Sequence, residues 1–391
     1  MDIVQIGSAR ADPVKFMDLV DSSQTKRCQR YVEKCNGPTE LFINKQKKSA
    51  LDYLSEAFKG MEQYKDKIGM IIDSSTTRGF TEPSQCSLYA MHLGIRYAAC
   101  FDVVEACNGW VRAAETAYYY LNCREELEDK YVLIINNEYP PETRAVVPKS
   151  PDDYQACASY YVGLTFSTVC TVTLLKKSNN RSWRFFNSSD TIYASHINIP
   201  LPGLAKDFCP TSKEYSVYFT ECYGQFCLPR FHAMEEKGLE VLAYVEKRKE
   251  FFEDANVICH TYTKKVWEEL FQFNKFKKLS LYFNETGNLG SCSFPYIAKD
   301  QYGTTLPKGE HIAFMGTAAG GSGSIVTFVH EQDDGPLDSQ YPKVKKVEPI
   351  GRKLLLLKLG FRALFKKILC QKKKRNYKSY SPQGAVDQKT E

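Results

Sequence analysis

Residues 101–121 read FDVVEACNGWVRAAETAYYYL, and this stretch joins a short apolar strand to an apolar helix through a turn of small residues. Cys107 lies in that turn, so its sulfur is expected at a helix N-terminus. Unsatisfied N–H groups and the helix dipole favour a thiolate at such a position, and a thiolate attacks thioester carbonyls. A buried cysteine without a chemical role is the alternative that this context leaves open.

A second stretch, LYFNETGNLGSCSFPYIA at 281–298, repeats the order of strand, small-residue turn and helix. This likeness predicts a chain built from duplicated halves. Around the two stretches, short apolar runs alternate with helical patterns, which is typical of a layered α/β protein. The expected strands are 68–72, 100–104, 131–135, 168–175, 256–259, 279–283 and 312–315, and the expected helices are 48–60, 109–121 and 231–252.

The bulk composition indicates a large folded body. The chain has 391 residues, 43% of them hydrophobic, and no apolar run approaches the roughly 18 residues that a membrane helix needs. We therefore expect a cytoplasmic protein. The 14 cysteines form no CxxC pair, so we expect reduced thiols and no metal site.

The net charge of +6 is unevenly distributed. Residues 343–391 carry 15 basic and 3 acidic residues, a net +12, which leaves the preceding body at −6. The basic tail therefore gives no reason to expect nucleic-acid binding by the body. Within the tail, apolar residues share one helical face and basic residues the other. The apolar face comprises Leu354, Leu357, Phe361, Leu364, Phe365 and Ile368, and the basic face Arg362, Lys366 and Lys367.

This basic amphipathic helix predicts peripheral contact of residues 350–378 with an anionic membrane surface. Docking of an acidic partner and a solvated extension without function are the alternatives.

Three other features carry candidate chemistry. His260 follows the apolar run NVIC and precedes a helical pattern, and Asn288 lies in a tight turn flanked by Gly287 and Gly290. Each has an ordinary structural alternative, as a satisfied histidine or a turn asparagine. The segment GTAAGGSGS, which starts at Gly316, matches no nucleotide-binding loop, but its backbone N–H groups are able to form an oxyanion hole.

Taken in order, these pieces resemble the ketoacyl-ACP synthase III group of the thiolase superfamily over most of residues 1–330. The matching pieces are an IGS opening, KIGMIIDSSTT, EPSQCSLYAMHLGI, FDVVEACNGW, VICH, GNLGSCSFP and the Gly-rich end. The resemblance implies an α/β thiolase fold with duplicated halves in five αβαβα layers. It also implies a homodimer that works with acyl carrier protein.

The residues and the resemblance together predict four segments. Residues 1–176 would form the half with the nucleophile and 226–330 the half with the His and Asn. Residues 177–225, which have little periodicity, would form a loop-rich substrate cover, and 331–391 a linker, the basic helix and a disordered tail.

The resemblance also implies the roles of the site residues. Cys107 would accept an acyl group from acyl-CoA or acyl-ACP, without a cofactor, and condense it with malonyl-ACP in fatty-acid or polyketide-type biosynthesis. His260 and Asn288 would stabilise the enolate formed by decarboxylation. The backbone N–H of Cys107, with one from the turn Ala318, Ala319 and Gly320, would form a second oxyanion hole.

The sequence departs from the family pattern at three places. TYT follows His260 where a small residue and an Asn are usual, LTFSTVCT at 164–171 replaces a GDGAGA-like segment, and 21–38 lacks the Trp that stacks on adenine. Two other functions therefore stay open. One is acyl transfer to a hydroxyl or amine, and the other is a non-catalytic partner subunit on the same scaffold.

Overall fold

The computed structural model describes residues 1–19, 37–140, 163–189, 232–262 and 264–332. It also describes the single residues 26, 30, 33 and 191 and the two-residue strands β9 (Ile197–Asn198) and β10 (Phe226–Cys227), which pair with each other. The expected tail helix lies outside the described residues.

The first five-stranded sheet belongs to the N-terminal half and has the order β1-β7-β6-β4-β5. β4 runs parallel to β5 and β6, whereas β7 runs antiparallel to β6 and β1. The strands are β1 (Asp2–Arg10), β4 (Ile68–Asp73), β5 (Ala99–Asp102), β6 (Tyr131–Glu138) and β7 (Val169–Lys176).

The second five-stranded sheet repeats this topology. Its order is β12-β11-β13-β14-β8, with β11 parallel to β12 and β13, and β14 antiparallel to β13 and β8. Chain order and strand direction therefore match the first sheet, which confirms the predicted duplication. The strands are β8 (Arg184–Ser189), β11 (Asn256–Cys259), β12 (Lys278–Ser280), β13 (His311–Ala318) and β14 (Ser322–Val329).

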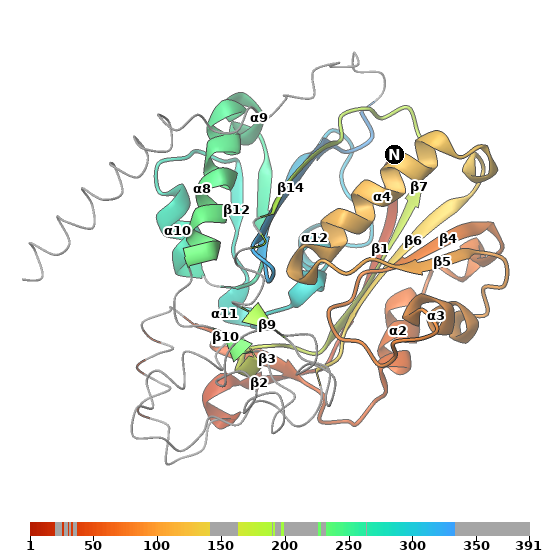
Figure 1. Ribbon diagram of the computed structural model, residues 1–391, viewed down its shortest axis with the longest axis horizontal. Coiled ribbons are helices and arrows are strands. Elements are labelled where there is room, and N and C mark those ends of the chain that lie inside the picture. The colour runs from red at the N-terminus through yellow and green to blue at the C-terminus, as the bar shows by residue number, and fades with distance from the viewer. Residues whose placement is uncertain are drawn as a thin grey trace, which may run out of the picture. The chain divides into compact units, whose positions relative to one another are not determined.

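Helices complete five layers (Figure 1). α2 (Ala50–Phe58) and α3 (Gln85–Leu93) pack on the outer face of the first sheet. α4 (Gly109–Cys123) and α12 (Ser293–Tyr302) lie between the sheets, in a core that takes residues from both. α8 (His232–Lys247), α9 (Lys249–Glu253) and α10 (Lys264–Phe271) cover the outer face of the second sheet. The predicted αβαβα arrangement is confirmed.

Shorter elements connect the layers. A small hairpin pairs β2 (Asp12–Lys15) with β3 (Glu40–Ile43). The short helices are η1 (Phe16–Leu19), η2 (Glu62–Lys67), η3 (Ala106–Asn108), η4 (Glu125–Leu127), α11 (Phe283–Thr286) and η6 (Gly290–Cys292).

The sequence of α4 explains how a helix fits between two sheets. Ala113, Ala114 and Ala117 are fully buried, and their small side chains allow the sheets to approach the helix closely. Trp110 fills the remaining space: its Nε1 donates to Thr173 Oγ1 at 3.0 Å in the first sheet, and its ring meets Phe314 of the second edge-on at 4.8 Å. Burial of a large apolar side chain such as that of Trp110 or Phe314 stabilises the fold by roughly 2–3 kcal/mol.

All seven predicted strands exist, but two end earlier than expected. β5 stops at Asp102, and β12 stops at Ser280 before α11 begins at Phe283. The predicted helix 231–252 is interrupted at Arg248, between α8 and α9. Seven of the described strands were not predicted. They are β1, β8 and β14 of the two large sheets, the hairpin strands β2 and β3, and the two-residue strands β9 and β10. β8 lies within the expected cover 177–225, most of which is outside the described residues, so the cover stays a prediction.

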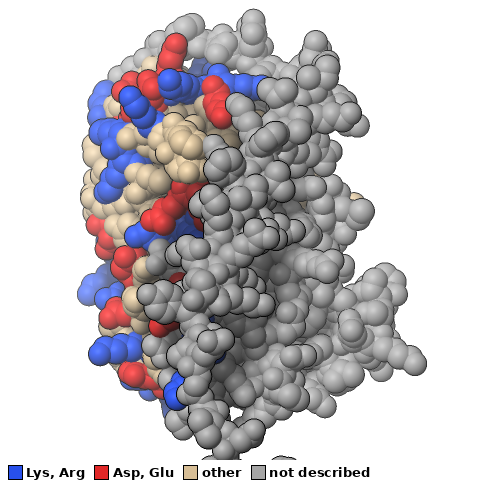
Figure 2. All heavy atoms as spheres, turned by 90° about the vertical axis from the view of Figure 1, so that its left-hand side faces the viewer, with Lys and Arg blue, Asp and Glu red and all other residues tan. Residues whose placement is uncertain are grey.

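Charges of both signs are interspersed on the face that Figure 2 shows, over its described part. On α9 and α10, ion pairs join residues one helical turn apart: Lys249 with Glu253 at 3.4 Å and Lys264 with Glu268 at 3.8 Å. Among the described residues, no helix is long and apolar enough to cross a membrane.

Candidate active site

Cys107 lies in η3, immediately before α4, at the helix N-terminus that the sequence predicts. Ala106, just before it, has φ of 47°, in the left-handed region that non-glycine residues rarely adopt. Such backbone strain costs about 1–3 kcal/mol and is concentrated at functional sites. The chain therefore holds this turn in a conformation that its local sequence does not prefer.

The expected thiolate at Cys107 is not supported. The side chain is only 7% exposed, and burial, together with the nearby negative charge of Glu138, raises the thiol pKa to about 12. The helix N-terminus does not offset this increase in the thiol pKa, because the free energy needed to remove the thiolate from water exceeds the stabilisation that the helix dipole provides. The resting thiol is therefore neutral at pH 7.

His260 is held by its backbone at the end of β11. Its N–H donates to the carbonyl of Met315 in β13 at 2.8 Å, and its own carbonyl accepts from Trp267 Nε1 at 3.0 Å. The Tyr262 ring stacks parallel to the imidazole, with centroids 6.2 Å apart. Burial lowers the pKa of His260 to about 4, so the ring is neutral at pH 7 and is able to donate from only one nitrogen.

Asn288 is fully buried and its amide is oriented by the backbone. Gly290 N–H donates to Asn288 Oδ1 at 2.9 Å, and His260 Nε2 lies 3.3 Å from the same oxygen. This leaves Nδ2 as the donor end of the amide. Among the described residues, Nδ2 has no hydrogen-bond partner. A buried amide without a partner is costly, which is consistent with a position for a ligand oxygen.

The unusual segment at 164–171 holds the backbone of Asn288. Asn288 N–H donates to Thr165 O at 2.7 Å, and Asn288 O accepts from Ser167 N–H at 2.9 Å. The TYT departure after His260 also has a structural role. Thr261 Oγ1 accepts from Leu289 N–H at 2.8 Å and lies 2.9 Å from Ser293 Oγ, so it ties the histidine segment to the asparagine turn.

The turn that carries Cys107 packs against the elements that carry the other two residues. A Cβ added at Gly316 of β13 would lie 2.4 Å from Asn108 Oδ1, and one added at Gly109 would lie 3.4 Å from Ser291 Cβ. His260 is bonded to β13 at Met315, and Asn288 lies two residues before η6. The three predicted residues therefore lie on or next to elements that pack against one another.

The predicted oxyanion turn lies beside the same site. Ala318 ends β13, and Ala319 and Gly320 lead into β14, with Gly320 in the left-handed region at φ of 85°. Asn108 Nδ2 donates to Ser322 Oγ at 3.1 Å, just past the turn. The turn is therefore anchored to the residue that follows Cys107. Its role in binding an oxyanion stays a prediction.

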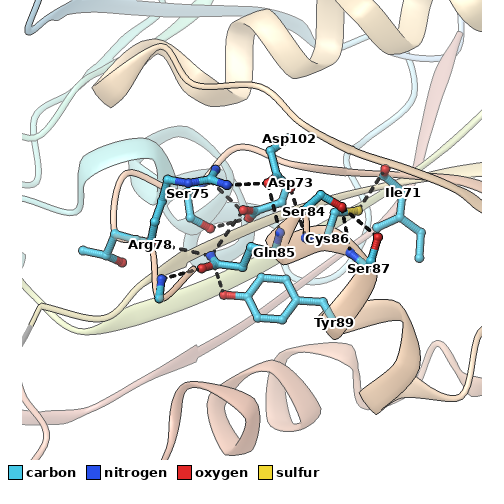
Figure 3. Close-up of polar contacts among 12 residues, drawn as sticks. Ile71, Asp73, Ser75, Arg78, Ser84, Gln85, Cys86, Ser87, Tyr89 and Asp102 are labelled. Carbon is cyan, nitrogen blue, oxygen red and sulfur yellow. Dashed lines mark hydrogen bonds and ion pairs between the residues drawn. The ribbon is translucent and has the colours of Figure 1, made fainter. Parts of the chain in front are cut away.

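Sequence reasoning missed a buried polar cluster next to this site (Figure 3). Asp73 and Asp102 are paired in register on β4 and β5. Arg78 forms an ion pair with Asp102, and Gln85 Nε2 donates to Asp73 at 3.3 Å. Burial, reinforced by the charge of Asp102, raises the pKa of Asp73 to about 7. The signal for this cluster in the sequence was Asp73, an acidic residue at the end of the apolar run IGMIID.

A cavity of about 620 Å³ lies elsewhere, at the β2–β3 hairpin and β12, and is lined by Arg10, Phe42, Lys278, Tyr282 and Tyr296 among others. Neither Cys107, His260 nor Asn288 lines it. Within the described residues, no group of acidic, His and Cys side chains is arranged to hold a metal ion.

No protein-family model matches the chain, and no curated protein matches it. Solved structures of OleA from Xanthomonas campestris do match. The structure with bound lauric acid and lauroyl-CoA has a TM-score of 0.64 at 17% identity, covering 84% of this chain and 98% of OleA. The cerulenin-bound structure has the same TM-score at 18% identity, covering 84% and 96%. OleA is a thiolase-superfamily condensing enzyme. The architecture and these likenesses together show that this chain has the thiolase fold.

Proposed function

We propose that this protein is a condensing enzyme that acylates Cys107 from an acyl thioester and extends the acyl group with malonyl-ACP. The observation that carries the proposal is the pair of buried groups beside the Cys107 turn. Asn288 presents an unpartnered amide donor, and His260 is a neutral imidazole 3.3 Å from the same amide. Two donors without a countercharge suit an enolate oxygen, because they bind the anion when it forms and do not need it at rest.

Acylation begins with a neutral thiol. The Cys107 sulfur attacks the thioester carbonyl, the C–S bond to the donor breaks, and the departing thiolate takes up the Cys107 proton. The products are acyl-Cys107 and a free thiol. The carbonyl oxygen becomes anionic in this step, and the backbone N–H groups of Cys107 and the turn Ala318–Gly320 would receive it.

Condensation uses the His260 and Asn288 donors. Malonyl-ACP loses carbon dioxide, and the electron pair of the broken C–C bond forms an enolate. The enolate oxygen accepts hydrogen bonds from Asn288 Nδ2 and from the Nε2–H of His260, which exchanges its contact with Asn288 Oδ1 for one with the enolate. The enolate carbon attacks the acyl carbonyl, the bond to Cys107 breaks, and the Cys107 thiolate that leaves takes a proton from water to regenerate the thiol. Each donor would contribute about 3–4 kcal/mol to stabilising the transition state.

Lauroyl-CoA is the first acyl donor to test, because OleA has been crystallised with it. The protein is incubated with lauroyl-CoA, and its intact mass is measured. One lauroyl adduct is expected on the native chain and on Cys123→Ala, which removes an exposed cysteine, but not on Cys107→Ala. Addition of malonyl-ACP should then release a ketoacyl product. Acylation without any ketoacyl product would contradict the condensation step.

One observation favours a second function, a non-catalytic subunit on the thiolase scaffold. The Cys107 thiol is buried and has a raised pKa, as a structural cysteine does. If no thioester in a panel of acyl-CoA and acyl-ACP donors acylates Cys107, this second function replaces the first.

A further inference from the structure

Glu138 is the last residue of β6 and is fully buried. Its carboxylate accepts four hydrogen bonds from two separate loops. The N–H groups of Thr76 and Thr77 donate at 3.0 and 3.1 Å, and Ser291 donates from its N–H at 3.0 Å and from its hydroxyl at 2.5 Å. So many donors on one buried carboxylate indicate a fixed anion, because charge-assisted hydrogen bonds replace its hydration.

The two loops belong to different halves of the fold. Thr76 and Thr77 follow β4 in the first sheet, whereas Ser291 lies in η6, next to the asparagine turn. Gly290, the first residue of η6, packs tightly against the carboxylate, since a Cβ added there would lie 2.8 Å from Glu138 Oε1. The N–H of this same glycine orients the amide of Asn288. Glu138 therefore binds Ser291, the residue that follows the glycine whose N–H orients the Asn288 amide.

Glu138 also acts on the nucleophile. Its negative charge is the second cause, after burial, of the raised pKa of the Cys107 thiol. One carboxylate thus contacts the asparagine turn and disfavours the thiolate of Cys107. No step of the reaction proposed above uses Glu138, so a role for this carboxylate goes beyond that reaction.

We propose that Glu138 is a positioning residue of this site, whose carboxylate locks the Asn288 turn of the C-terminal half against the Cys107 half. The inference rests on the proposed function, because a fixed amide matters only where it receives an enolate. Acylation of Cys107 does not use that amide. Loss of the carboxylate therefore impairs condensation and spares acylation.

The test compares Glu138→Gln, Ser291→Ala and Asn288→Ala. Acylation by lauroyl-CoA and ketoacyl formation with malonyl-ACP are measured separately. Glu138→Gln should lower condensation at least tenfold, a loss typical of one misplaced donor, while acylation should not fall below that of wild type. In the Asn288→Ala background it should have no further effect, because the two residues act as a unit. Glu310→Gln, which removes a partly buried carboxylate that binds Lys277 and Tyr302, is the matched control.

A second measurement does not depend on turnover. Alkylation of Cys107 by iodoacetamide is followed by peptide mass spectrometry between pH 7 and 9.5. Glu138→Gln should be alkylated at least about threefold faster at each pH, because a neutral amide no longer repels the thiolate. Ser291→Ala keeps the charge and should retain the wild-type alkylation rate, but it should share the condensation defect.

Equal losses of acylation and condensation, or additive losses with Asn288→Ala, would overturn the proposal. An unchanged alkylation rate in Glu138→Gln would do the same. If Glu138→Gln does not fold, normal condensation by Ser291→Ala overturns it. Failure of the proposed function itself would appear differently, as absence of a ketoacyl product from the wild-type protein.

Discussion

Replacement of Asp73 by Asn should change how the stability of the fold depends on pH. Asp73 is fully buried, and its pKa is raised from 3.8 to about 7, mainly by burial. Below pH 3.8 the folded and unfolded states both bind the proton, so the group costs nothing. As the pH rises to 7 the unfolded state releases the proton while the folded state keeps it. Stability is therefore lost through this window and does not fall further above pH 7.

The size of this loss in unfolding free energy follows from the shift in the pKa of Asp73. Three pKa units correspond to about 4 kcal/mol in total, of which roughly 2–3 kcal/mol is lost between pH 5 and 8. Asn is neutral throughout, so Asp73→Asn should lack this loss. Its amide oxygen keeps the donors of Ser75, whereas its amide nitrogen faces Gln85 Nε2. That contact costs a constant amount, which cancels when only the pH dependence is compared.

The assay is urea unfolding at pH 5, 6, 7 and 8, followed by tryptophan fluorescence, since Trp110, Trp183 and Trp267 are all buried. The difference in unfolding free energy between variant and wild type should move by roughly 2–3 kcal/mol in favour of the variant from pH 5 to 8. Asp66→Asn, at an exposed aspartate, is the control, because it shows how an Asp→Asn substitution changes the unfolding free energy where the carboxylate is not buried. Parallel pH curves for Asp73→Asn and wild type would refute a raised pKa at Asp73.

Three further outcomes are expected. His260→Ala and Asn288→Ala should each lower ketoacyl formation about 100-fold or more while Cys107 is still acylated by lauroyl-CoA, and a parallel loss of acylation would contradict their assignment to the enolate. Gly290→Ala should lower the unfolding free energy by about 1–3 kcal/mol more than Gly94→Ala in urea titrations. Both glycines have positive φ, but only Gly290 is crowded, by Phe166 and Glu138, so equal losses would exclude a steric cause. Full-length protein should float with anionic liposomes, and a chain without residues 343–391 should not; equal flotation would eliminate the membrane role of the tail.

The parts of the fold that could be predicted from the sequence are those where local pattern and burial agree. β4, β6 and β11 are nearly continuous apolar runs, as expected for strands that are covered on both faces. Cys107, His260 and Asn288 could be placed because each lies where a strand or turn meets a helix. Their meeting at one place follows from the duplicated topology, which the two similar stretches at 101–121 and 281–298 indicated.

The rest depends on long-range contacts. β14 reads SGSIVTFV. Its last five residues favour a strand, whereas SGS continues the glycine-rich turn, and pairing with β13 and β8 extends the strand back to Ser322. The thiol pKa of Cys107 was mispredicted for the same reason. A helix N-terminus can be read from the sequence, whereas burial and the charge of Glu138, 31 residues away, come only from packing.

The duplication also explains why the two halves of the site differ. η3 precedes α4 and η6 precedes α12, so Ala106, Cys107 and Asn108 correspond to Gly290, Ser291 and Cys292. Both turns begin with positive φ, 47° at Ala106 and 54° at Gly290. In the first copy the central residue is the candidate nucleophile. In the second it is a serine whose hydroxyl and N–H bind Glu138. The same strained turn therefore presents a reactive atom in one half and a structural contact in the other. The Glu138 carboxylate bonds the second turn to the loop that follows β4 in the first half.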